Sequence, residues 1–125
     1  GETNSAEDAP TNEKTIEPEY ITIEDFARLD LRVAEVIACE KMKKADKLLI
    51  LTLRVGEEER TVVSGIAQHY TPEEMVGKKV VLLANLKPTK LRGVMSHGMI
   101  LAASDDKYVD VLTVTKDIAS GERVK

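Results

Sequence analysis

The residues of this sequence that could do chemistry are mostly basic, and one group of them lies where acids are missing. Residues 75–104 contain no Asp or Glu, although 22 of the 125 residues are acidic and the net charge is −4. Lys87, Lys90 and Arg92 lie within this window. A long stretch with bases and no acids, in a chain that is acidic overall, indicates a surface that binds a polyanion.

A second basic group lies earlier, in the stretch CEKMKKADK. It holds Lys41, Lys43, Lys44 and Lys47, with Asp46 among them. Lysines in loops are often only solvated. Two basic connections that meet on one face of a fold would instead form a groove for phosphates, and we favour this second interpretation.

The motifs of catalytic and metal sites are missing. The sequence has no G-x-G-x-x-G, no P-loop and no H-E-x-x-H. Its one Cys and two His, at positions 39, 69 and 97, do not have the spacing of zinc ligands. Cys39 lies in an apolar stretch that is typical of a core, and Ser96 beside His97 has no acid nearby to orient the imidazole. We therefore expect no catalysis, no metal, no cofactor and no small-molecule substrate.

Composition favours a single cytoplasmic domain that follows a linker. No apolar run exceeds five residues, no signal-peptide pattern is present, and Cys39 has no second Cys with which to pair, so we expect neither a membrane span nor an oxidising compartment. Residues 1–19 carry six acids against Lys14, which leaves a net +1 for residues 20–125. The first segment has too few large apolar residues to fold, and we interpret it as a disordered acidic linker.

The rest of the chain predicts an all-β fold. Strands are expected at residues 31–39, 48–55, 61–66, 78–85 and 98–104, because apolar and β-branched residues alternate or cluster there. A capped helix is expected near Thr22, and a complete capping box from Thr71 to Glu74 predicts a short helix between the third and fourth strands. A further strand-like run at 108–114 belongs to a C-terminal extension. Five strands with this inserted helix favour an OB-fold barrel over an SH3-like barrel, which has a similar strand order.

The first basic connection would then join strands one and two, and the second would join strands four and five. In an OB-fold these two loops lie at the same edge of the binding face. Aromatic residues are scarce, and none lies in these loops, so a folded RNA held by its backbone fits better than a stacked single strand. Asn85 and Ser96 could donate to sugar or base edges, although Asn85 could equally cap a turn before Pro88. By its apolar setting Met99 is expected in the core more readily than at a contact.

Three stretches resemble one family. FARLDLRVAEVIACE, the segment from ADKLLILTLRV through VSGIA to ANLKP, and LRGVMSHGMILAAS are similar to the tRNA-binding domain at the C-terminus of bacterial methionyl-tRNA synthetases, which free-standing tRNA-binding proteins share. The resemblance runs from about residue 21 to the end. It implies an OB-fold that binds tRNA by shape with little sequence preference and that forms a homodimer through elements outside the barrel, including the C-terminal extension.

The resemblance also assigns roles to residues. It implies a non-catalytic appendage, with a parent chain that is a methionine–tRNA ligase, which raises the local concentration of tRNA at the synthetase. The alternatives are a free-standing tRNA-binding protein, or a module that mainly dimerises its parent. The family's binding positions fall on six residues here: Lys47, Asn85, Lys87, Arg92, Ser96 and Met99. Lys43, Lys44 and Lys90 join them by charge and position alone.

Overall fold

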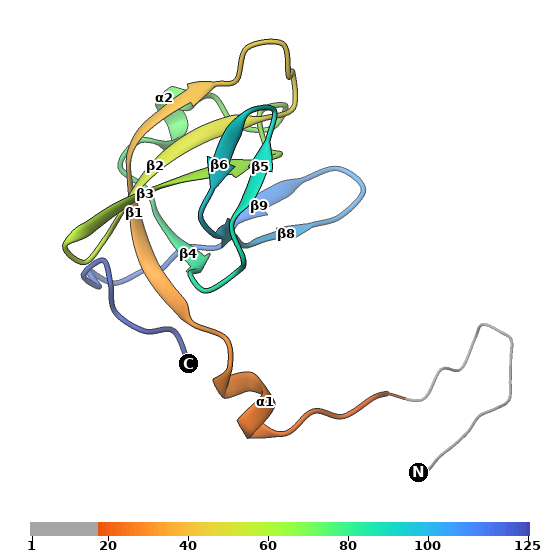
Figure 1. Ribbon diagram of the computed structural model, residues 1–125, viewed down its shortest axis with the longest axis vertical. Coiled ribbons are helices and arrows are strands. Elements are labelled where there is room, and N and C mark those ends of the chain that lie inside the picture. Colours follow the sequence, from red (N-terminus) through yellow and green to blue (C-terminus); the bar gives the residue numbers. More distant parts are fainter. Residues whose placement is uncertain (1–17) are drawn as a thin grey trace, which may run out of the picture.

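The computed structural model describes residues 18–125 (Figure 1). The predicted linker at 1–19 lies outside the described residues except for its last two. The elements are α1 (Ile23–Ala27), β1 (Leu31–Lys41), β2 (Leu49–Val55), β3 (Glu58–Ser64), α2 (Pro72–Met75), β4 (Lys79–Leu83), β5 (Thr89–Leu91), β6 (Val94–Ser96), β7 (Met99–Ile100), β8 (Ala102–Ser104) and β9 (Val109–Val111). No helix in this part of the chain is long and apolar enough to cross a membrane.

A curled antiparallel sheet forms the centre of this all-β fold. Its strand order is β3-β2-β1-β4-β7. The long β1 changes partner along its length, because residues 31–35 pair with β4 and residues 35–41 pair with β2. A register shift between Val36 and Ala38 marks a β-bulge, which bends the strand. The sheet therefore curls into a half-barrel (Figure 1).

The core lies inside this curl. Leu49, Leu51 and Leu53 alternate along β2 and have no exposed surface, as the period of two predicts. Met75 of α2 and Leu82 of β4 complete the same buried cluster. Burying each of these side chains stabilises the fold by about 1.5–3 kcal/mol relative to leaving it in water.

Both predicted helix caps are confirmed. The Thr22 hydroxyl accepts the Asp25 N–H at 3.1 Å, and the Asp25 carboxylate accepts the Thr22 N–H. At α2, Thr71 and Glu74 make the same reciprocal pair, and Pro72 occupies the first helical turn. The short helix between the third and fourth strands is therefore present as predicted.

The strand count differs from the five predicted, since the described residues hold nine strands. The stretch at 98–104 divides into β7 and β8, because residues 102–104 leave the sheet and pair with β9. The connection after β4, which was expected to be a loop, contains the hairpin of β5 and β6. Its two central residues, Arg92 and Gly93, have φ of 51° and 85°, as a two-residue hairpin turn of type I′ requires.

The C-terminal segment returns to the sheet. Gly121 N–H donates to the Val33 carbonyl at 2.7 Å, and Val124 N–H donates to the Leu31 carbonyl at 2.8 Å. The segment thus covers the part of β1 that β2 leaves unpaired, and the chain end lies near α1 (Figure 1). This covering protects what would otherwise be an open strand edge.

Candidate nucleic-acid interface

Two basic segments that are distant in sequence meet in the structure. We call residues 42–48, between β1 and β2, the basic loop, and residues 85–97, which contain β5 and β6, the basic hairpin. Arg92, at the tip of the basic hairpin, donates from Nη1 to the Lys44 carbonyl of the basic loop at 3.3 Å. Figure 1 shows the tip of the β5–β6 hairpin beside the basic loop, at the upper end of the molecule in this view. We call this shared edge the basic rim.

The contact at the basic rim uses two unusual backbone conformations. Lys44 has φ of 61° and Arg92 has φ of 51°, and they are the two non-glycine residues with positive φ in the described part of the chain. Such conformations cost of order 1 kcal/mol or more for a residue with a Cβ atom. Because the Arg92 guanidinium is held by a carbonyl and not by a carboxylate, its charge remains available to an anion.

Apolar packing beneath the basic rim fixes the two segments to each other. Met42 and Ala45 of the basic loop form a buried cluster with Val63 of β3, and Val94 of the basic hairpin packs against it. The Ala67 N–H also donates to the Lys47 carbonyl at 3.0 Å, which anchors the end of the basic loop. The lysines of the loop therefore project from a packed base.

Ser96 holds the basic hairpin on β3 through hydrogen bonds inside the protein. Its hydroxyl accepts the Val63 N–H at 2.9 Å and donates to the Gly98 carbonyl at 3.2 Å, and the residue is 4% exposed. The structure thus places this predicted contact residue below the surface, where its donor and one lone pair are already used.

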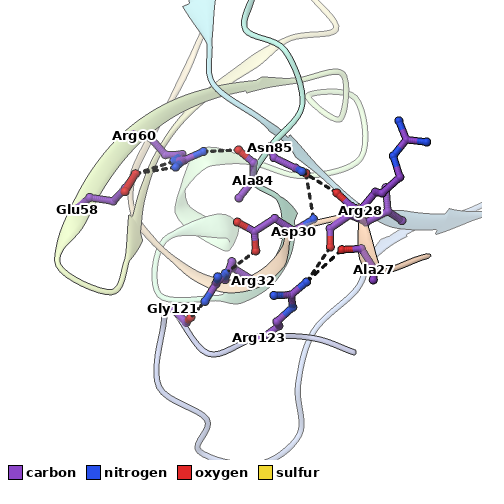
Figure 2. Close-up of polar contacts among 11 residues, drawn as sticks. Ala27, Arg28, Asp30, Arg32, Glu58, Arg60, Ala84, Asn85, Gly121 and Arg123 are labelled. Carbon is purple, nitrogen blue, oxygen red and sulfur yellow. Dashed lines mark hydrogen bonds and ion pairs between the residues drawn. The ribbon is translucent and has the colours of Figure 1, made fainter. Parts of the chain in front are cut away.

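Asn85 also makes contacts within the protein. Its Oδ1 accepts the Asp30 N–H at 3.0 Å, and its Nδ2 donates to the Arg28 carbonyl at 2.7 Å (Figure 2). These bonds join the start of the basic hairpin to the chain just after α1. The side chain keeps an exposed face, and its hydrogen bonds go to the chain after α1 rather than to the turn before Pro88 that was the alternative expected for it.

Lys87 lies between two surface pockets. One, of about 380 Å³, is lined by Asn85, Lys87 and His97 among others. The second, of about 220 Å³, is lined by Lys87, Ser96 and Met99 together with aliphatic side chains of the basic hairpin. Met99 is 44% exposed, so it lies at the surface and not in the core, contrary to the expectation from its apolar setting. A cation between a polar and a more apolar hollow suits a phosphate with its ribose or base beside it.

Within residues 18–125, no carboxylate forms an ion pair with the candidate cations. Among the described residues, the ion pairs involve Arg32, Arg54, Arg60 and Lys79. None of them uses a lysine of the basic loop, Lys87, Lys90 or Arg92. Lys43, Lys44, Lys47, Lys87, Lys90 and Arg92 are all exposed. The basic rim is therefore a positively charged surface on an acidic chain.

The Cys39 thiol is a poor nucleophile in its setting. It is half-buried on β1, and burial, followed by the negative charges of Glu73 and Glu40, raises its pKa to about 11. A thiol with so high a pKa is protonated at neutral pH. This agrees with its assignment to the core rather than to a reactive site.

Sequence analysis missed Arg60, which lies in β3 beside the interface. Its guanidinium contacts Glu58 and the carbonyls of Ala84 and His97. The stretch EEER contains three acids before the arginine and lies between the strands expected at 48–55 and 61–66, so nothing in the sequence indicated a partner 24 or 37 positions away.

Comparison with known proteins gives a consistent result. A family model described as a putative tRNA binding domain matches residues 31–123. The chain is 59% identical over 106 residues to the methionine–tRNA ligase of Deinococcus radiodurans, covering 84% of this chain and 16% of that protein. It is 52% identical over 125 residues to the methionine–tRNA ligase of Bacillus subtilis, covering 94% of this chain and 19% of that protein. The chain thus spans less than a fifth of the length of these relatives.

A solved structure matches over nearly the same region. The crystal structure of a MetRS-related protein from Pyrococcus horikoshii has a TM-score of 0.82 and 38% sequence identity, covering 86% of this chain and all of that chain. The fold described above is therefore similar to that of a known protein over 86% of this chain.

Proposed function

Because this chain belongs to the family of putative tRNA-binding domains, which it shares with methionine–tRNA ligases, we propose that it is a non-catalytic module that binds tRNA through the basic rim. The observation that carries the proposal is the contact from Arg92 to the Lys44 carbonyl, since it brings two basic segments that are distant in the sequence into one surface.

We take the fold to be an OB-fold barrel. The His97 N–H donates to the Thr61 carbonyl at 2.8 Å, and this bond helps to close the half-barrel between β3 and the strands that follow β4.

Charge is the main source of affinity in this proposal. The exposed lysines and Arg92 replace condensed counterions at the tRNA backbone, and their release favours binding. The proposed contacts are Lys43, Lys44, Lys47, Lys87, Lys90 and Arg92 for phosphates, with Met99 packing against a ribose or base beside Lys87. Asn85 and Ser96 act mainly by shaping the basic hairpin, because their hydrogen bonds are made within the protein. Shape and backbone contacts suit a folded RNA and give little sequence preference.

The module would work as a tether. Joined to a methionine–tRNA ligase in the cytoplasm, it would hold tRNA near a separate active site and raise its local concentration without any chemistry of its own. The identity to two such ligases supports this role. A free-standing tRNA-binding protein would use the same basic rim.

A second function, dimerisation with another copy of the chain, is supported by apolar side chains at the opposite end of the molecule. Tyr20, Ile21 and Ile23 are 88%, 68% and 72% exposed, and α1 has no buried residue. Leu29 lies beside them and lines a surface pocket of about 390 Å³ with Leu83. Exposed apolar clusters of this kind are typical of protein contacts. Figure 1 shows α1 far from the basic loop. The pocket at Leu29 also includes Asn85 and Leu86, so the proposed dimer surface is separate from the basic loop and borders the start of the basic hairpin.

Because the basic loop lies far from α1, substitutions in the basic rim can test RNA binding without changing the proposed dimer contacts. The double variant Lys47→Glu, Arg92→Glu should bind tRNA at least a hundredfold more weakly, because about two phosphate contacts become repulsive, while its mass in solution stays that of the wild type. A matched control, Lys107→Glu with Lys116→Glu, makes the same charge change away from the basic rim. If the control loses as much affinity, net charge and not the rim governs binding. If the double variant binds normally, the proposal is wrong.

A further inference from the structure

Arg60 of β3 makes a set of contacts that its own strand does not require. Its Nε and Nη2 donate to Glu58 Oε2 at 3.1 and 2.6 Å. Its Nη1 donates to the Ala84 carbonyl at 2.8 Å and to the His97 carbonyl at 3.1 Å. Figure 2 shows the guanidinium between Glu58 and Ala84. The side chain is 20% exposed, so this arginine is largely withdrawn from solvent.

The two carbonyls that accept from Arg60 lie at the two ends of the basic hairpin. Ala84 immediately precedes residues 85–97, and His97 is the last residue of that segment. One planar guanidinium therefore ties both ends of the segment to each other and to β3. Arginine suits this task because its donors lie in a fixed fork, whereas the ammonium group of lysine is a single point.

The same contacts make Arg60 a poor ligand for RNA. Its four hydrogen bonds use four of the five N–H donors that a guanidinium has. Glu58 balances its charge through an ion pair at 2.6 Å. A phosphate that approached Arg60 would meet a neutralised and occupied group, unlike Arg92 at the tip of the hairpin.

We propose that Arg60 is a positioning residue for tRNA binding: it fixes the base of the basic hairpin so that Lys87, Lys90 and Arg92 are presented in one geometry. This inference rests on the proposed function. Without the guanidinium, the hairpin would sample several positions, and tRNA would bind the fraction that is in the right one. The apparent dissociation constant rises in inverse proportion to that fraction.

Salt dependence separates positioning from direct contact. A residue that touches a phosphate releases about 0.9 of a counterion, or somewhat less on single strands, so its loss makes the slope of log affinity against log salt shallower by that amount. A residue that only positions others lowers affinity at every salt concentration and leaves the slope unchanged.

The experiment measures tRNA affinity over a range of salt for the wild type and for Arg60→Met, Arg60→Lys and Arg54→Met. Arg54→Met is the matched control, because Arg54 is exposed on the neighbouring β2 and its ion pair with Glu35 is at 4.0 Å. Arg60→Lys keeps the positive charge and removes the planar guanidinium with its fixed N–H donors. Hydrogen exchange of residues 85–97 is measured on the same proteins.

We expect both Arg60 variants to bind about tenfold more weakly or worse, the ratio that one lost hydrogen bond of ordinary strength supplies, with slopes equal to that of the wild type. Exchange should quicken in the basic hairpin and not in β1 or β2. Arg54→Met should match the wild type in affinity and exchange.

Four results would overturn the inference. They are a slope shallower by about 0.9 in Arg60→Met, wild-type affinity in Arg60→Met, full rescue by Arg60→Lys, and failure of both variants to fold, since that would show Arg60 holding the whole sheet. A wild-type chain that does not bind tRNA would instead overturn the proposed function, and the inference with it.

Discussion

Gly98, between the basic hairpin and β7, is a glycine whose replacement should perturb the fold through two identified contacts. Its φ is 126°, and a Cβ atom there would lie 2.9 Å from Leu82 Cδ1 and 2.9 Å from the Leu83 carbonyl oxygen. Leu82 has no exposed surface, and Leu83 is fixed by its pairing with β1 and β7. The added methyl group therefore meets a packed side chain and a backbone oxygen that cannot easily move.

The cost of Gly98→Ala has two parts. A residue with a Cβ atom at positive φ costs roughly 1–2 kcal/mol, and overpacking of a tight site adds roughly 1–3 kcal/mol. Gly93→Ala is the matched control, because Gly93 also has a positive φ, 85°, but no atom lies within 4 Å of its added Cβ. The control should lose the first part alone. We expect Gly98→Ala to be less stable than Gly93→Ala by about 1–3 kcal/mol.

Urea unfolding followed by circular dichroism measures this difference, and it suits the chain because the sequence has no Trp for fluorescence. At this chain length a loss of 1 kcal/mol lowers Tm by roughly 4 °C, so thermal unfolding gives an independent check. Equal stabilities for the two variants would refute the reasoning, since they would show that β4 and Leu82 yield to the methyl group at no cost.

A further prediction concerns the reactivity of Cys39. Alkylation of Cys39 at pH 8 should be about a hundredfold slower in the folded chain than in urea, because a pKa raised from 9.0 to about 11 lowers the thiolate fraction by that factor; equal rates would contradict the burial of this thiol. Because the pKa of the Cys39 thiol is higher in the folded chain than in the unfolded one, the contribution of this thiol to the free energy of unfolding is complete below pH 9. That contribution is lost as the pH rises through about 11.

Local sequence signals predicted the parts of the fold that depend on neighbours in the chain. The capping boxes at Thr22 and Thr71 need only residues three positions apart, and both are present. The alternation of Leu49, Leu51 and Leu53 gave the buried face of β2 in the same way. Such patterns predict elements well because the physics that they report is local.

Structural features that depend on contacts between distant segments were not predicted from the sequence. The type I′ turn at Arg92 and Gly93 was not foreseen, because an arginine with positive φ is rare and the usual signal for this turn is Asn or Asp before Gly. The division of residues 98–104 into β7 and β8 depends on pairing with β9, which lies beyond a turn.

For the interface, sequence reasoning placed the cations correctly on exposed segments but did not foresee which polar groups serve the fold. Ser96 and Asn85 were expected to contact the RNA. In the structure Ser96 makes hydrogen bonds to Val63 and Gly98, and Asn85 makes hydrogen bonds to Asp30 and Arg28. A Ser or Asn looks the same in sequence whether it faces a ligand or a backbone amide. The packing of the hairpin decides between the two roles.

The most direct test of the central claim is the salt dependence of tRNA binding by the unaltered chain. If the basic rim neutralises about five phosphates, log affinity should fall with log salt concentration with a slope near −4. A slope close to zero would contradict the claim, because a complex held by lysine and arginine side chains on phosphates must release ions as it forms.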